Sequence, residues 1–434
     1  MDWLPHSLFW EQKNVRDPLY GFISLSAQEN RILETFAVQR LARIKQLAHT
    51  YIVYPGAVHT RLEHSLGSLN VAARICDQLS LKKREREIVR ATALIHDIGQ
   101  GPFSHPFEKV MRFVNGEDYS HEDVTKLMIE HYHPLKRALG SLRQDVLQTF
   151  DGDSLLSEVI SSSVDSDKLD YLRRDSHHTG VAYGIFDFER IVRNLSKHHE
   201  TDRDYIAIAE KAKDALESYR LARYSMQSQV YEHHARLIAD DMFVRAVIIS
   251  IKEGYLPKES LDVSNQEKFL PRYIELDDSS IEHYLLQNAK GIAKELIQDV
   301  RARKLLKRAY ILPLRKDCVP NPIQRDKIAT LKGDVAENTE KKIADEIGID
   351  SGYVIVHPQS INIKLYERFE QTIGGKEKPI LVLKRDGSVT SLEEVSPISA
   401  SVNPIRRLFV FCPDRYAQEV KKIAEDIFKA RSVY

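Results

Sequence analysis

The 434-residue sequence predicts a mainly α-helical protein with a small α+β lobe at its C-terminus. From about Ser26 to Lys252, apolar residues recur mostly at the spacing of amphipathic helices. Towards the C-terminus the pattern changes to short apolar runs bounded by turn residues, which is typical of strands. We therefore expect a helical domain at 1–255, a helical extension and connector at 256–325, and the small α+β lobe at 326–434.

In the N-terminal half, one helix is expected to end at His96–Asp97. Its apolar face is marked by residues at i, i+3, i+4 and i+7, namely Ile88, Ala91, Thr92 and Ile95. The segment DIGQGPFSH, 97–105, then breaks the helix, because its two glycines and its proline do not continue one. Ser120, with Asp123 three residues later, resembles a capping box and predicts the start of the next helix.

Two further long helices are expected, at 155–180 and at 280–309. Gly180 is expected to end the first, because glycine is the usual residue after a helix. Periodicity weakens at 255–273, which indicates a loop or the edge of a subdomain. The three prolines of 313–326 predict a connector.

Short strands are expected in the C-terminal part. They are 353–357, 361–367, two strands within 379–392, and 407–412. Asp386-Gly387 is a hairpin turn signal inside the third of these segments. An amphipathic helix at 413–430 closes the chain.

Composition limits the class of protein. Lys+Arg and Asp+Glu both number 63, so the net charge of zero argues against a general nucleic-acid binder. The three cysteines, Cys76, Cys318 and Cys412, are far apart, which disfavours a disulfide framework or a zinc finger. We find neither a signal-peptide pattern nor an apolar stretch long enough to cross a bilayer, and we expect a cytoplasmic protein without membrane contact.

Three residues are suited to a divalent cation. His64, His96 and Asp97 offer two imidazoles and a carboxylate, with no thiolate. A fourth ligand has to come from elsewhere, and the aspartate-rich segment 164–175 is the obvious source. A His-Asp dipeptide by itself is a weak signal in a chain with 17 histidines, since most single histidines serve structural or surface roles.

The chain resembles the HD-domain deoxynucleoside triphosphate triphosphohydrolases. Blocks of the family pattern occur in order from residue 13 to about 250: DPLYGFISLSAQE, FAVQRLARIKQLAHTYIVYPGAVHTRLEHSLG, LIHDIGQGPFSH, SHEDVTKLMIEH, VDSDKLDYLRRDSHHTGV and RYSMQSQVYEHH. The C-terminal strands match the small lobe of the family more loosely. The resemblance thus implies an HD-domain helical core, which begins so early that no separate SAM domain is expected.

The resemblance also implies a metal site. The family's metal ligands correspond to His64, His96, Asp97 and Asp167, and Asp167 lies in the aspartate-rich segment already considered. It implies one tightly held transition metal, with iron, manganese and zinc all open, and a Mg²⁺ ion that arrives with the substrate.

Phosphate binding and proton transfer are implied for further residues. Arg61, Lys168, Tyr171 and Arg223 match the family residues that hold the triphosphate. His105 matches the general acid, with Glu108 or Glu122 orienting its imidazole and His121 nearby. The implied reaction is attack of a metal-activated water on the α-phosphorus, which releases a 2′-deoxynucleoside and inorganic triphosphate.

Sugar selection is implied for Gln46, Leu47, Asp175 and Tyr231, with ordinary core packing as the alternative for Leu47. The chain departs from the family at Gln100, where many members have histidine. At the regulatory nucleotide site of some relatives, Glu34 and Gln39 fit, whereas Ala42, followed by Arg43, stands where arginine is expected. A regulatory nucleotide therefore stays open, and so does the choice among the four dNTP substrates.

Two other functions remain open. One is an HD phosphohydrolase that acts on another phosphoester, such as a ribonucleotide or a nucleic-acid end. The other is a nucleotide-sensing oligomer without turnover. The resemblance suggests a homo-oligomer, either a dimer or a tetramer.

Overall fold

A computed structural model describes residues 13–200, 203–361, 379–396 and 405–433. The chain divides into two compact units. The first draws on Met1–Met226, Glu259–Ile281 and Leu365–Val402, and the second on Gln227–Lys258, Glu282–Lys364 and Asn403–Tyr434. The domain bounds expected from the sequence, 1–255, 256–325 and 326–434, stay a prediction.

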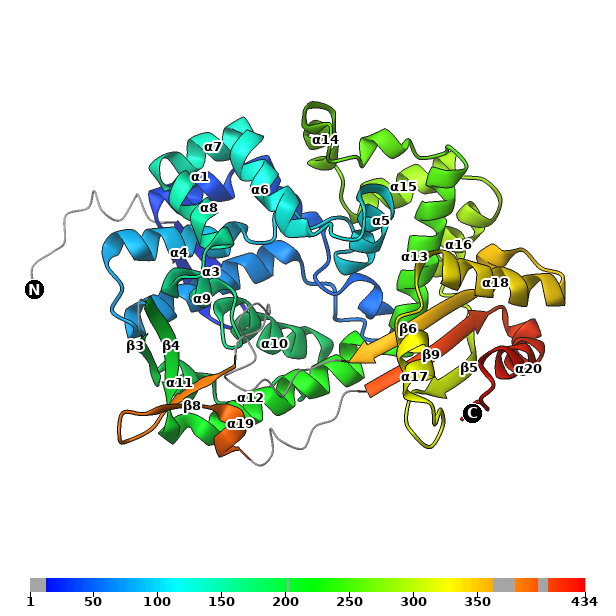
Figure 1. Ribbon diagram of the computed structural model, residues 1–434. Helices are drawn as coiled ribbons and strands as arrows, with labels where there is room; N and C mark the ends of the chain where they lie inside the picture. The colour runs from blue at the N-terminus through cyan, green and yellow to red at the C-terminus, as the bar shows by residue number, and fades with distance from the viewer. Residues whose placement is uncertain (1–12, 201–202, 362–378, 397–404, 434) are drawn as a thin grey trace, which may run out of the picture. The chain divides into compact units, whose positions relative to one another are not determined.

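Helices make up most of the first unit, as Figure 1 shows. They are α1 Ala27–Leu33, α2 Phe36–Gln39, α3 Arg61–Gln78, α4 Lys83–Ile95, α5 His105–Asn115, α6 His121–His131, α7 His133–Leu139, α8 Arg143–Asp151, α9 Leu155–Ile160, α10 Ser166–Thr179, α11 Phe188–Val192, α12 Lys213–Met226, α14 Gln266–Tyr273 and α19 Leu392–Val395. Helix α3 packs against both α4 and α10, and its buried face carries small and apolar residues such as Leu69, Ala72 and Ala73. The prediction of a mainly α-helical fold is confirmed.

Helix starts and stops follow the local sequence closely. The predicted capping box of α6 is present, with Ser120 and Asp123 exchanging hydrogen bonds between side chain and backbone. Gly180 ends α10 in the left-handed region, with φ 75°, as expected of a glycine after a helix.

The segment 155–180 is not one helix, as predicted, but two. Helix α9 ends at Ile160, and Ser161 has extended backbone angles. Asp165 then starts α10 as its N-cap, with its side chain accepting a hydrogen bond from the Lys168 N–H. A run of serines and an aspartate competes for backbone hydrogen bonds, which explains the break.

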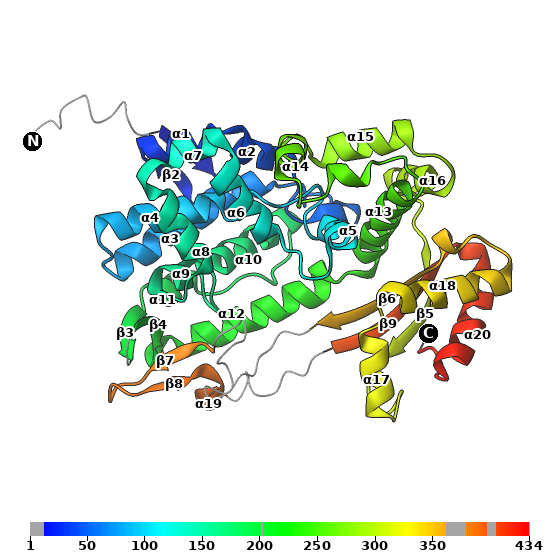
Figure 2. The same cartoon turned by 45° about the horizontal axis from the view of Figure 1, so that its top comes forward.

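Two small sheets of the first unit were not predicted in full. Strands β1 Lys13–Asp17 and β2 Gly21–Leu25 form a hairpin. The second sheet has the order β3-β4-β7-β8, with β3 Leu195–Glu200, β4 Arg203–Ala209, β7 Leu381–Leu383 and β8 Val389–Ser391. Strands β7 and β8 form the predicted hairpin, in which Gly387 has φ 86°, and β7 pairs in parallel with β4 (Figures 1 and 2).

The second unit combines helices with a three-stranded antiparallel sheet of order β5-β9-β6. Its strands are β5 Lys307–Pro313, β6 Ile355–Ile361 and β9 Ile405–Cys412. Its helices are α13 His234–Lys252, α16 Gly291–Arg301, α17 Pro322–Ala329, α18 Gly333–Ile347 and α20 Ala417–Phe428. Helix α15, Asp278–Asn288, begins in the first unit and ends in the second.

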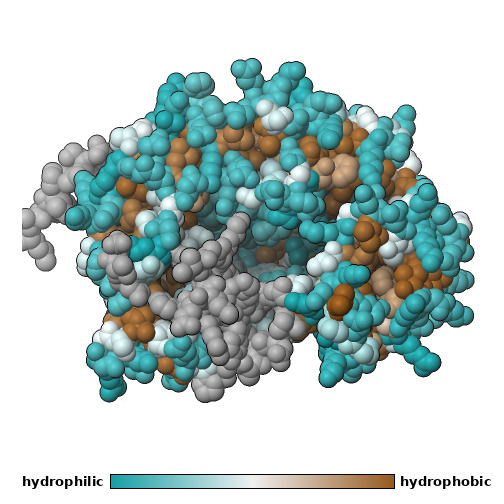
Figure 3. All heavy atoms as spheres, viewed as in Figure 1, coloured by the Kyte–Doolittle hydropathy of each residue, from teal (hydrophilic) through white to brown (hydrophobic). Residues whose placement is uncertain are grey.

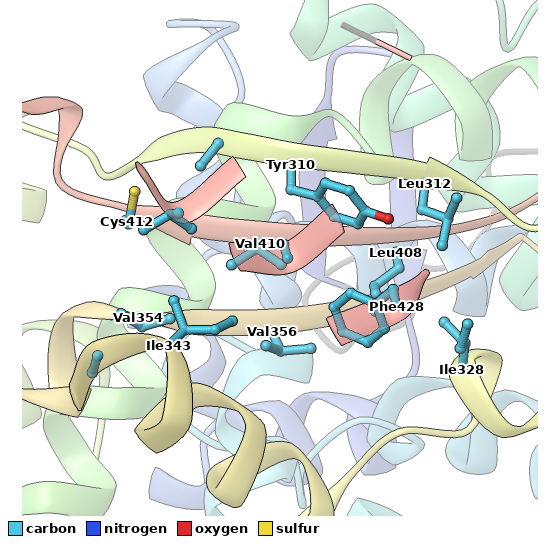
Figure 4. Close-up of a cluster of buried hydrophobic side chains, with 14 of the residues drawn as sticks. Tyr310, Leu312, Ile328, Ile343, Val354, Val356, Leu408, Val410, Cys412 and Phe428 are labelled. Atoms are coloured by element: carbon cyan, nitrogen blue, oxygen red, sulfur yellow. The ribbon is translucent and has the colours of Figure 1, made fainter. Parts of the chain in front are cut away.

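Side chains of all three strands form the core of this sheet, as the close-up in Figure 4 shows. Tyr310, Val356 and Val410 are buried there and are covered by Ile343 of α18 and Phe428 of α20. Helix α20 is the C-terminal helix expected at 413–430.

The segment 280–309 also differs from the single helix expected. Helices α15 and α16 are separated around Gly291, whose φ of 51° favours glycine, and the chain enters β5 at Lys307. Ala309 to Leu314 form an apolar run, and residues 307–313 pair with β9, so tertiary pairing overrides the helical pattern expected from the sequence. Of the predicted strand at 361–367, all but the first residue lies outside the described residues.

The face shown in Figure 3 carries mostly hydrophilic residues with smaller apolar areas among them, as is usual for water-exposed surface. Among the described residues, no helix is long and apolar enough to cross a membrane.

Candidate metal centre and active site

Four predicted ligands from three separate segments meet in the first unit. His64 lies near the start of α3, His96 and Asp97 directly follow α4, and Asp167 lies in the first turn of α10. The His64 Nε2 atom is 2.9 Å from Asp167 Oδ1 and 3.8 Å from Asp97 Oδ2. The His96 Nε2 atom is 3.5 Å from Asp97 Oδ2 and 3.7 Å from Asp167 Oδ1. Two imidazole nitrogens therefore face two carboxylates at distances of 2.9 to 3.8 Å, close enough for all four groups to bind one cation.

The ring of His96 shows that this group of side chains fits a cation. Its Nδ1 is 2.8 Å from the carbonyl oxygen of Ala93, which only accepts, so Nδ1 carries the proton and Nε2 presents a lone pair. Nε2 is buried, and no hydrogen-bond partner for it exists among residues 13–200, 203–361, 379–396 and 405–433. A buried lone pair without a partner is costly, and a divalent cation among His64, His96, Asp97 and Asp167 would remove that cost.

A buried carboxylate orients the other imidazole ligand. His64 Nδ1 lies 2.8 Å from Asp170 Oδ2, which leaves Nε2 to face the ligand cluster. Arg174 in turn donates to both oxygens of Asp170, from Nε at 2.8 Å and from Nη2 at 2.9 Å. This arrangement is the one by which proteins usually fix the ring of a metal-binding histidine.

The electrostatics of the cluster favour positive charge. Burial by itself lowers the pKa of His64, but hydrogen bonds with Asp167 and Asp170 outweigh it and raise that pKa to about 10. Burial raises the pKa of Asp97, yet the positive charges of Arg61 and of the imidazoles hold it well below its usual range. The site thus stabilises ionised carboxylates, which are the form that binds a cation.

Arg61, predicted to contact phosphate, lies directly against the cluster. It is buried at the first position of α3, and its Nη1 is 2.5 Å from Asp97 Oδ2. Its Nε donates to Ser104 Oγ at 2.8 Å, which ties α3 to the turn before α5. A guanidinium has five N–H donors, so these two bonds do not exhaust its capacity to contact an anion.

Glu108 joins the two histidines considered for proton transfer. Its Oε1 lies 2.8 Å from His121 Nδ1 and 3.3 Å from His105 Nδ1. Burial raises the pKa of Glu108, but these two hydrogen bonds outweigh it and lower that pKa far below its usual value. His121 Nε2 lies 3.8 Å from Asp97 Oδ1, while the His105 side chain is 66% exposed. Glu122 is exposed and, within the described residues, makes no hydrogen bond to either ring.

Lys168, Tyr171 and Asp175 share one face of α10, as their spacing predicts, and Asp167 precedes them. Burial raises the pKa of Tyr171 to about 12, although the positive charges of Arg223 on α12 and of Lys168 oppose the rise. Lys168 bonds Asp165 Oδ2 at 2.8 Å. The first unit thus contains, besides the ligand cluster, the three cationic side chains expected to bind phosphate: Arg61, Lys168 and Arg223.

Gln46 and Leu47 are buried in a segment that runs beside His59. The Gln46 N–H donates to the His59 carbonyl oxygen at 3.0 Å, and His59 Nε2 lies 2.8 Å from Asp175 Oδ1. Gln46 and Asp175, two of the four residues expected around the sugar, are thereby connected through His59. The fourth, Tyr231, belongs to the second unit at the end of Gln227–Tyr231, and its role stays a prediction.

The residues expected to differ from the family, Gln100 and Ala42, lie in different surroundings. Gln100 is buried, and its backbone oxygen accepts a hydrogen bond from Arg40 Nη2 at 2.7 Å. Ala42 is exposed, and Arg43 pairs with Asp277 at 2.6 Å. Among the other regulatory positions considered, Glu34 pairs with Lys13 at 2.6 Å and Gln39 donates to the Leu33 carbonyl at 2.8 Å.

Several residues around the site were not found from the sequence: Asp170, Arg174, Glu63, His178 and His59. Asp170 and Arg174 are four residues apart, and that spacing does indicate a pair of opposite charges on a helix. It gives no sign of His64, which is 106 positions away in the chain.

Comparisons with known proteins identify related sequences and folds. A family model described as HD domain matches residues 61–156, and one described as HD associated region matches 186–433. The chain is 32% identical to an uncharacterized protein of Bacillus subtilis, over 93% of this chain and 92% of that one. It is 26% identical to the deoxynucleoside triphosphate triphosphohydrolase SAMHD1 of Xenopus laevis, over 82% of this chain and 66% of that one. The crystal structure of a phosphohydrolase from Bacteroides thetaiotaomicron matches with a TM-score of 0.73 and 25% identity, over 93% of this chain and 100% of that one.

Proposed function

Because the chain belongs to the HD-domain phosphohydrolase family, we propose that it is a metal-dependent deoxynucleoside triphosphate triphosphohydrolase. It cleaves a dNTP to a 2′-deoxynucleoside and inorganic triphosphate. Water forms the new bond to the α-phosphorus, the bond from that phosphorus to O5′ breaks, and O5′ takes up a proton.

The ligand cluster is the observation that carries this proposal. His64, His96, Asp97 and Asp167 converge, and the buried Nε2 of His96 has no hydrogen-bond partner among the described residues. A divalent cation held by these four residues would supply Lewis-acid chemistry to the phosphoryl group and would acidify a bound water. Iron, manganese and zinc are all compatible with two imidazoles and two carboxylates, and Mg²⁺ would accompany the triphosphate.

The other residues of the chain bind the substrate and move the proton. Arg61, Lys168 and Arg223 supply positive charge for the triphosphate oxygens, with Tyr171 beside them on α10. Glu108 holds the Nδ1 atoms of His105 and His121, which leaves Nε2 of each ring as the atom that exchanges a proton. His105 is the proposed acid that protonates O5′.

Analysis of the products tests the proposal. The full-length protein is incubated with each dNTP and each ribonucleoside triphosphate, with Mn²⁺ or Mg²⁺, and the products are separated by ion-exchange chromatography. In H₂¹⁸O, attack on the α-phosphorus places the label in triphosphate rather than in the nucleoside. Asp97→Ala should lose bound metal and turnover together, while Glu130→Ala, which changes an exposed carboxylate on α6, should keep both.

Other outcomes would support the alternatives. Monophosphate with pyrophosphate, or turnover of ribonucleotides, would indicate action on another phosphoester. Saturable nucleotide binding without turnover would indicate a nucleotide-sensing protein. Activity retained by Asp97→Ala would overturn the assignment of the site.

A further inference from the structure

His59 is a buried histidine for which metal binding, phosphate binding and proton transfer leave no role. Its side chain is 0% exposed, and its Nε2 lies 2.8 Å from Oδ1 of Asp175, which is buried as well. This is the only hydrogen bond of the ring within the described part of the chain, and Nδ1 is buried without a partner there. A carboxylate only accepts, so Nε2 carries the proton and donates it to Asp175.

Neighbouring residues hold both the ring and the backbone of His59. Its face stacks on the ring of His178, with centroids 4.3 Å apart and an angle of 13° between the planes. His178 is fixed in turn by Glu63 Oε1, 2.7 Å from its Nε2, and Glu63 accepts a hydrogen bond from Arg174 at 3.1 Å. The backbone of His59 is held as well, because its carbonyl oxygen accepts a hydrogen bond from the Gln46 N–H.

Close packing at Gly56 fixes the same region. A Cβ at Gly56 would lie 2.4 Å from the carbonyl oxygen of His178, so the chain before His59 passes directly over the end of α10. The position of the His59 ring is therefore set by its surroundings and not by Asp175 alone. The ring of His59 therefore holds one oxygen of the Asp175 carboxylate in a fixed direction.

We propose that His59 is a positioning residue that orients the Asp175 carboxylate for the 3′-hydroxyl of a 2′-deoxyribose. This inference rests on the proposed function. The free hydroxyl of a 2′-deoxynucleoside triphosphate is the 3′-hydroxyl, and a carboxylate is a strong acceptor for it. A carboxylate has about four lone-pair positions, and the hydrogen bond from His59 takes up one of those on Asp175.

The neighbours of Asp175 agree with this role. Asp175 shares its helix face with Lys168 and Tyr171, which are proposed to bind the triphosphate. Gln46, which contacts the His59 backbone, has a buried side-chain oxygen without a hydrogen-bond partner in the described segments. Asp175 and Gln46, which both contact His59, thus offer acceptors suited to a hydroxyl group.

Hydrolysis of each dNTP and of its 2′,3′-dideoxy analogue measures this role directly. The wild-type protein should prefer the dNTP, because the analogue lacks the hydroxyl that Asp175 accepts. His59→Phe keeps a flat ring for stacking on His178 but has no donor, and it should reduce the ratio of the two kcat/KM values by roughly tenfold. His59→Gln, whose amide nitrogen reaches the position of Nε2, should restore most of the preference.

Two controls separate positioning from a merely structural role. The metal content of His59→Phe should equal that of the wild type, because His59 touches none of the proposed ligands. Asp175→Asn should lose the preference as His59→Phe does. Should His59→Phe fail to fold, His59→Asn serves in its place, since its amide is too short to reach Asp175.

Each outcome bears on one of the two proposals. A wild-type protein that hydrolyses no dNTP contradicts the proposed function and removes the basis of the inference. A wild-type protein that hydrolyses dNTPs and dideoxy analogues equally well contradicts the inference alone. The inference also fails if Asp175→Asn loses the preference while His59→Phe keeps it.

Discussion

Gly67 lies inside α3, although glycine weakens a helix interior by roughly 0.5–1 kcal/mol relative to alanine. A Cβ at this position would lie 2.0 Å from Asp170 Oδ1 and 2.2 Å from Arg174 Nη2. Both side chains are fully buried, and together they hold the ring of His64. Glycine therefore lets α3 approach α10 closely enough for the metal ligand and its orienting carboxylate to meet.

Gly67→Ala should destabilise the protein, even though alanine is the better helix former. Crowding in a packed interior typically costs about 1–3 kcal/mol, which exceeds the gain in helix propensity. We expect a net loss of unfolding free energy of about 1–2 kcal/mol in urea titrations, together with weaker metal binding. Asn70→Ala on the same helix is the matched control, because Asn70 is only partly buried. Equal stability of Gly67→Ala and the wild type would contradict the close packing.

The turn between α4 and α5 has unusual backbone geometry. Phe103 and Ser104 have φ angles of 55° and 61°, a region that residues with a side chain seldom adopt. Asp278 stabilises this turn from the start of α15, where it accepts the Phe103 N–H at 2.6 Å and the Lys45 N–H at 3.0 Å. One carboxylate thus joins the turn that leads to His105 to the segment that carries Gln46.

Asp278→Asn should loosen both segments at once. The amide replaces one acceptor oxygen with a donor, so one buried backbone N–H loses its partner at a cost of about 1–3 kcal/mol. We expect that loss in the unfolding free energy, measured by denaturant titration, together with a lower kcat. Asp118→Asn, at an exposed position, should change neither quantity. An unchanged kcat in Asp278→Asn would show that the turn does not need this carboxylate.

At the scale of the whole molecule, the chain contributes again to the first unit after it has passed through much of the second. Strand β7 pairs in parallel with β4, with Ala207 opposite Leu381, and β8 continues that sheet (Figure 2). The three strands β5, β9 and β6 make a separate sheet in the second unit. The C-terminal strands are therefore shared between the two units and do not form one sheet.

Metal removal should lower the stability of the unit that contains the ligands. A ligand present at a hundred times its dissociation constant stabilises the folded state by about 2.7 kcal/mol. Chelation is therefore expected to lower Tm by roughly 5–10 °C in calorimetry. Asp97→Ala should not respond to the chelator, because it lacks the bound ion. The same fall in Tm in that variant would place the stabilising metal elsewhere.

The sequence by itself determined where several helices start and stop and which residue types were expected at the candidate site. Helical periodicity, the capping box at Ser120 and the stop at Gly180 are local features, set by interactions among residues a few positions apart. The hairpin at Gly387 is local in the same sense. The ordered family blocks also indicate His64, His96, Asp97 and Asp167 as candidate ligands from the sequence alone.

The tertiary structure alone decided what depends on distant parts of the chain. The pairing of β7 with β4 and the entry of 307–313 into a strand depend on partners that sequence spacing does not reveal. The same holds for Asp170 beside His64 and for His59 beside Asp175, whose partners lie 106 and 116 positions away. His64 and Asp170 meet because α3 and α10 pack together, and helix packing is set by the shapes of both surfaces.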